Sequence, residues 1–193
     1  MRGRVCADAR RRISGVTGKS LALILALCAA IAGGAMYYLQ VYGFYYPVDD
    51  APEQGVTLAL RDSDTATTID FEDFEAIDAD SSPIRYRACF TTAADPVELA
   101  QTHVTLTDMV PRNAPGWFDC FDAAALTREI EAGTATVFLG TKNIAYGVDR
   151  VIAITDQGRG YIWHDLNNCG NKTYDGTVIG EECPPRPDTQ RTN

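Results

Sequence analysis

The stretch from Ser20 to Val48 contains no charged side chain, and it constrains the fold more than any other part of the sequence. Its central part, Leu21–Gln40, has 20 residues. As an α-helix this part would extend about 30 Å, the thickness of the hydrocarbon core of a bilayer. We therefore predict a transmembrane helix over residues 20–42.

The residues on either side of this stretch give it a direction. Residues 1–19 form a basic segment that contains Arg2, Arg4, Arg10, Arg11, Arg12 and Lys19. The other end carries a belt of aromatic side chains, Tyr37, Tyr38, Tyr42, Phe44, Tyr45 and Tyr46. Because basic residues flank membrane helices on the cytoplasmic side, we expect a single-pass protein of the inner (cytoplasmic) membrane. Its N-terminus would be cytoplasmic and its C-terminal domain periplasmic.

Two further properties of the apolar stretch stay open. A secretory signal would be cut after Ala32, since Ala30-Ile31-Ala32 fits the cleavage pattern, although the apolar run is longer than a usual signal. The spacing of small residues could also let two helices pack as a homodimer, through Ala26, Ala30 and Gly34. Alternatively, these residues serve no specific partner.

The remainder of the chain is acidic. Beyond residue 20 it carries 11 basic and 25 acidic residues, a net charge of −14. Phosphate backbones and anionic lipid headgroups repel a domain of that sign, so we expect no nucleic-acid partner.

Four of the six cysteines fall in the predicted exported domain: Cys89, Cys120, Cys169 and Cys183. An even number in an oxidising compartment predicts two disulfides. Three pairings are possible, and we favour Cys89 with Cys120 and Cys169 with Cys183, because the second pair closes a polar segment with little core of its own. The absence of a Cys-x-x-Cys pair argues against a zinc site.

The periodicity of the exported part predicts an α+β fold, one small domain with a mainly antiparallel sheet and one or two helices. Asp95-Pro96 starts a short helix, and Asp122 caps a stronger one that ends at Gly133. The predicted strands are Val56–Leu60, Phe74–Asp78, Ile84–Thr91, Ala135–Gly140, Tyr146–Thr155 and Gly160–Leu166. The polar residues 62–68 read as a loop. The predicted boundaries are a linker over 43–55, a domain over 56–183 and a disordered tail over 184–193.

No constellation of side chains in the sequence predicts catalysis. The chain has two histidines, His103 and His164, and it lacks a nucleophile elbow, a phosphate-binding glycine loop and a calcium-loop spacing. We therefore expect no catalytic residue, no metal and no cofactor. Trp117 lies in an aromatic cluster beside Cys120, and it is either a partner contact or part of a core that the disulfide closes.

Five stretches together resemble a family of small, uncharacterised, single-pass envelope proteins of alphaproteobacteria: residues 35–42, 76–90, 114–121, 146–150 and 158–164. The resemblance spans most of residues 20–185. It implies a compartment and no catalytic residue. Such proteins are sometimes labelled histidine kinases, but this chain has neither the length nor the nucleotide-binding motifs of a kinase. The longer basic N-terminus, Met1–Gly18, departs from the family pattern.

These observations favour a membrane-anchored interaction or accessory module of the cell envelope that binds a protein partner, rather than an enzyme. The alternatives are a hydrolase-like envelope enzyme, for instance one built around His164 and carboxylates, and a ligand-sensing domain.

Overall fold

The computed structural model describes residues 17–48, 55–63 and 65–185. It contains two compact units, Met1–Val41 and Tyr42–Asn193. Most of the predicted basic segment 1–19, part of the predicted linker 43–55 and most of the predicted tail 184–193 lie outside the described residues.

The apolar stretch is a helix, α1 (Gly18–Tyr38), which continues as the π-helical turn η1 (Leu39–Gly43). Thr17 caps its start, since its hydroxyl accepts a hydrogen bond from the Ser20 backbone at 3.3 Å. The helix from Gly18 to Gly43 has 26 residues, none of them buried, and is long and apolar enough to cross a membrane. This helix is consistent with a membrane anchor. Ala26, Ala30 and Gly34 are exposed along it.

The second unit is built on a six-stranded sheet in which all neighbouring strands are antiparallel, so the predicted α+β class is confirmed. In spatial order the strands are β1 (Tyr46–Pro47), β4 (Glu72–Asp78), β5 (Arg87–Thr91), β8 (Arg159–Leu166), β7 (Val148–Thr155) and β6 (Ala135–Ala145). A separate antiparallel pair is formed by β2 (Val56–Ala59) and β3 (Ala66–Ile69).

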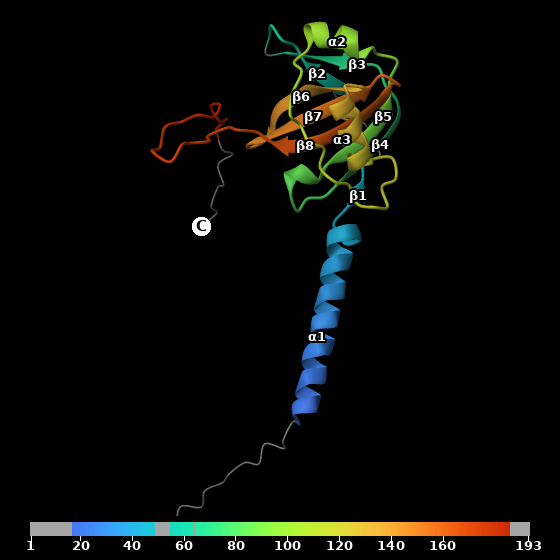
Figure 1. Cartoon of the computed structure of the whole chain (residues 1–193), viewed down its shortest axis with the longest axis vertical. Helices are drawn as coiled ribbons and strands as arrows, with labels where there is room; N and C mark the ends of the chain where they lie inside the picture. Colours follow the sequence, from blue (N-terminus) through green and yellow to red (C-terminus); the bar gives the residue numbers. More distant parts are fainter. Residues whose placement is uncertain (1–16, 49–54, 64, 186–193) are drawn as a thin grey trace, which may run out of the picture. The chain divides into compact units, whose positions relative to one another are not determined.

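The sheet is buried on both faces, so the unit has two hydrophobic clusters. One cluster includes Leu126 of helix α3 (Ala123–Ala132), with Val151 and Trp163 of the sheet. The other places Leu58 of the β2–β3 pair against Ile152 and Ile162, and Leu99 of helix α2 (Pro96–Thr102) packs beside it. Figure 1 shows α3 lying across the sheet and α2 beside the β2–β3 pair.

Both predicted helices begin at their predicted capping residues, and α3 also ends at the predicted one. The Asp95 carboxylate accepts a hydrogen bond from the Val97 backbone at 2.7 Å at the start of α2. Asp122 accepts one from Ala125 at 2.9 Å at the start of α3. Helix α3 ends at Gly133, whose φ of 73° is the left-handed conformation that glycine adopts at little cost.

Three local expectations differ from the structure. Part of the predicted loop 62–68 is strand β3, in which Ile69 alone is buried, so its sequence carries no alternating apolar signal. The predicted strand from Ile84 begins instead with the 3₁₀ turn η2 (Pro83–Arg85), and β5 starts at Arg87. Within the predicted linker 43–55, Tyr46–Pro47 pairs with Asp78 and Ile77 of β4.

Candidate functional site

A disulfide closes the loop that follows β8, joining Cys169 to Cys183. In Figure 1 this loop, coloured orange to red, runs out from the end of the sheet. It contains no regular strand among its described residues, only an isolated bridge between Lys172 and Val178. The loop is therefore an appendage of the sheet and is shaped by its own covalent and hydrogen-bonded links.

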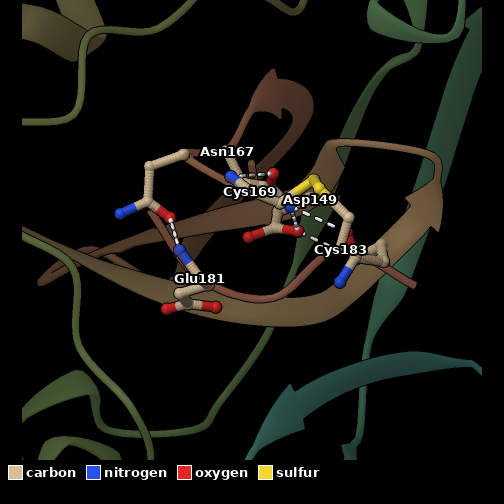
Figure 2. Close-up of a disulfide and its surroundings, with 7 residues drawn as sticks. Asp149, Asn167, Cys169, Glu181 and Cys183 are labelled. Carbon is tan, nitrogen blue, oxygen red and sulfur yellow. Dashed lines mark hydrogen bonds between the residues drawn. A yellow bond between two sulfur atoms is a disulfide. The ribbon is translucent and has the colours of Figure 1, made fainter. Parts of the chain in front are cut away.

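The base of the loop is tied to the β6–β7 hairpin through Asn167. The Asn167 side-chain amide donates to Asp149 Oδ1 at 2.7 Å and to Asn143 Oδ1 at 2.9 Å. Its carbonyl oxygen accepts from the Cys169 backbone at 3.0 Å. Figure 2 shows Asp149 and Asn167 beside the disulfide. Because one amide bonds both the hairpin and the first cysteine, the start of the loop has a fixed position on the sheet.

The second half of the loop has its own links. Glu181 forms an ion pair with Lys142 of β6 at 2.6 Å, and its carbonyl accepts from the Gly170 backbone at 2.9 Å. Asn171 accepts from the Ile179 backbone, also at 2.9 Å. The two halves of the loop are thus joined by backbone hydrogen bonds as well as by sulfur.

The tip of the loop is an ordered turn with exposed apolar side chains. The Asp175 carboxylate accepts hydrogen bonds from the Thr173 hydroxyl and the Thr177 backbone, which lower the pKa of Asp175 to about 2. Three exposed side chains form what we call the tip patch: Tyr174, which is fully exposed, Val178 and Ile179. A rigid base that carries exposed aromatic and branched side chains has the character of a protein-binding loop.

The sequence contains few signals from which the tip patch could be predicted. Its three apolar residues are scattered through a polar run with no helical or strand period. The available signal is the pair of cysteines 14 residues apart.

Trp117 is only partly exposed, at 37%. It stacks on Tyr42 and meets Tyr45 and Phe118 edge to face. The neighbouring Phe118 and Phe121 are buried in the cluster beneath α3. The aromatic segment is thus divided between core and surface, with Trp117 at the surface.

Arg87 fixes the loop that carries Trp117. Its guanidinium donates to four backbone carbonyls at 2.6 to 3.0 Å, those of Ile84, Tyr86, Arg112 and Asn113. The disulfide between Cys89 and Cys120 attaches the same loop to β5. Burial lowers the pKa of Arg87 to about 10. Sequence reasoning missed this residue, because strand alternation places an arginine on the solvent side.

His164 lies inside the domain with both ring nitrogens hydrogen-bonded. Its Nδ1 bonds to the Pro83 carbonyl at 2.8 Å, and Arg150 Nε donates to its Nε2 at 3.2 Å. The Tyr86 ring stacks on the imidazole with centroids 4.6 Å apart. The side chain is 5% exposed, and burial lowers its pKa to about 4. In this arrangement His164 offers no nitrogen to a substrate.

His103 is also buried, and it joins α2 to the β2–β3 pair. Its Nε2 bonds to the Thr67 hydroxyl at 2.7 Å, and its Nδ1 bonds to the Leu99 carbonyl at 2.9 Å. This histidine connects structural elements.

Surface hollows and acidic clusters point to no specific ligand. A surface hollow of about 680 Å³ lies between the β2–β3 pair and β6, and its charged lining residues are Arg61, Asp62 and Lys142. The Arg61 side chain is already hydrogen-bonded within the protein, because its Nε donates to the His103 carbonyl at 2.8 Å. Across the described residues no group of three or more His, Cys, Asp or Glu side chains is placed to hold a metal ion.

The comparison with protein families identifies a matching family. The model of a family of unknown function, DUF6446, matches residues 56–184. This agrees with the resemblance to an uncharacterised family. No match was found among the curated proteins or the solved structures.

Proposed function

The chain belongs to the DUF6446 family of unknown function, and we propose that it is a membrane-anchored envelope protein whose exported domain binds a protein partner through the Cys169–Cys183 loop. The apolar helix would hold it in the inner membrane with its N-terminus in the cytoplasm. The disulfides suit an oxidising compartment such as the periplasm.

The observation that carries the proposal is the contrast between the base of the loop and its tip. The base is fixed by a disulfide, by Asn167 and by the Lys142–Glu181 ion pair. The tip patch of Tyr174, Val178 and Ile179 faces solvent. A loop ordered in advance loses little conformational entropy on binding, so exposed apolar side chains on it are well suited to contact a partner.

A photo-crosslinking amino acid at position 174 tests the proposal in intact cells that make the protein natively. We expect a discrete crosslinked species with an envelope protein. A matched control places the same probe at Arg128, which is exposed on α3 on another part of the domain. The control is expected to give no such species.

A second arm replaces Cys169 and Cys183 by serine in the variant that carries the probe at 174. The tip patch keeps its side chains but loses its covalent closure, so the crosslink should weaken strongly. An absence of any discrete product at 174, or the same product at 128, would rule out this loop as the binding surface.

A further inference from the structure

An aromatic cluster at the start of the second unit joins residues that are far apart in the chain. Trp117 stacks on Tyr42 with ring centroids 6.3 Å apart and meets Tyr45 edge to face at 6.0 Å. We infer that Trp117, Tyr42 and Tyr45 form a lipid-contacting cluster, which holds the exported domain at the headgroup level of the bilayer. The inference rests on the proposed membrane anchoring and does not depend on the partner loop.

The position of Tyr42 in the chain brings the cluster to the bilayer surface. Tyr42 directly follows Val41, the last residue of the unit that contains the apolar helix. Strand β1 begins at Tyr46, so only Gly43–Tyr45 separate Tyr42 from the sheet. A residue at the end of a membrane span lies at the lipid–water interface, where tyrosine and tryptophan are favoured.

The exposure of the cluster suits an interface with one apolar and one wet side. Tyr42 is 46% exposed and Trp117 37%, and Tyr45 is partly buried against the core. Half-buried aromatic rings keep an apolar body available to the acyl-chain boundary, while the Tyr hydroxyl and the indole nitrogen remain at the polar side.

The loop that carries Trp117 is held in place by the domain. Arg87 binds the carbonyls of Arg112 and Asn113, before Trp117, and the disulfide from Cys89 holds Cys120, after it. Trp117 is therefore presented from a fixed position.

Charge and tethering favour a lipid surface as the occupant. The net charge of −14 beyond residue 20 opposes attraction to anionic headgroups, so contact with lipid must come from the aromatic rings. The covalent anchor keeps the cluster beside the bilayer, so a weak apolar contact is sufficient because the effective concentration is high. The contact should therefore not require anionic lipid.

The two tryptophans of the chain make the test direct. Trp163 is 0% exposed and serves as an internal reference, so the difference in emission between the native full-length chain and Trp117→Phe reports Trp117 alone. The full-length chain is placed in phosphatidylcholine vesicles whose lipids carry bromine near the headgroup or deep in the chains. The measurement is repeated with added phosphatidylglycerol, and flotation of the vesicles checks that the chain is anchored.

We expect both chains to float and the Trp117 emission to be lost mainly with bromine near the headgroup, in vesicles that contain no phosphatidylglycerol as well as in those that do. Failure to float would overturn the anchoring and this inference together. Floating without quenching, with Trp117 reached instead by aqueous iodide, would overturn the inference alone. Trp117 shielded from both bromine and iodide would indicate a protein contact and would also overturn it, as would quenching that requires phosphatidylglycerol.

Discussion

Arg150 and His164 lie directly opposite one another on strands β7 and β8, and Arg150 Nε donates to His164 Nε2 at 3.2 Å. The imidazole is therefore held as an acceptor, which requires the neutral ring. A second proton on His164 would place a cation beside the Arg150 guanidinium in a buried environment.

This pairing predicts that the domain loses stability in acid. The folded-state pKa of His164 is about 4, against 6.5 for a free imidazole, because burial disfavours the charged ring. The unfolded chain therefore binds the proton first as pH falls. The stabilisation is complete above about pH 6.5 and is lost progressively down to about pH 4, by on the order of 3 kcal/mol. Urea denaturation at a series of pH values measures this loss.

The control for this prediction is His164→Asn, whose amide can still donate to the Pro83 carbonyl. We expect a lower stability at neutral pH and a flatter profile between about pH 6.5 and 4. Burial raises the pKa of Asp78, so protonating Asp78 favours the folded state, and this opposing contribution is shared by both chains. An unchanged pH slope in the variant would show that His164 is not the responsible group.

Substitution of Arg87 by lysine should destabilise the domain by about 2–4 kcal/mol. One ammonium group cannot reach the four carbonyls that the guanidinium binds, so buried acceptors lose their donors. Arg159→Lys is a matched control, because Arg159 is paired with Glu129 at the surface and should cost less than about 1 kcal/mol. Equal effects of the two substitutions in denaturant titrations would contradict the proposed role of Arg87.

Gly160 lies opposite Phe90 on the neighbouring strand, and a Cβ added there would overlap the Phe90 ring. We expect Gly160→Ala to cost about 1–3 kcal/mol through overpacking. Gly116→Ala has no atom within 4 Å of the new Cβ and should be nearly neutral. Thermal unfolding of the two variants compares them. If overpacking is the cause, adding Phe90→Leu to Gly160→Ala should cost less than the sum of the two single changes.

The sequence predicted best those elements whose signals are local. Helix α3 is bounded by Asp122 and Gly133, and both act through their immediate neighbours in the chain. Strand β5 shows the limit of such signals. The alternation over residues 84–91 predicted one buried face through Ile84, Tyr86, Ala88 and Phe90. The last three are buried, whereas Ile84, which lies in the turn η2, is only half-buried.

The opposite face of β5 is buried as well, because the loop carrying Trp117 covers Arg87 and Cys89. A sequence pattern among neighbouring residues does not indicate which distant loop will cover a strand. The same reason explains why strand β1, two residues long and defined only by its pairing with β4, could not be predicted.

The two disulfides should differ in what they stabilise, although both close loops. Cys89 is buried in the cluster beneath α3, so replacing Cys89 and Cys120 by alanine should lower the free energy of unfolding by about 3–4 kcal/mol, the loop-closure value. The Cys169–Cys183 loop lies outside both hydrophobic clusters. Without its disulfide this loop can become disordered in the folded protein as well, which cancels most of the entropic gain.

We therefore expect Cys169→Ala with Cys183→Ala to change the melting temperature little but to expose Lys172 to trypsin, since Lys172 is the only trypsin site between the two cysteines. Cleavage after Lys172 should be faster in this variant than in the native chain. In the Cys89/Cys120 variant, at temperatures where it is folded, cleavage after Lys172 should be as slow as in the native chain. A large loss of melting temperature with no faster cleavage at Lys172 would mean that the loop is part of the cooperative core, and the distinction between a fixed base and a separately ordered tip would then fail.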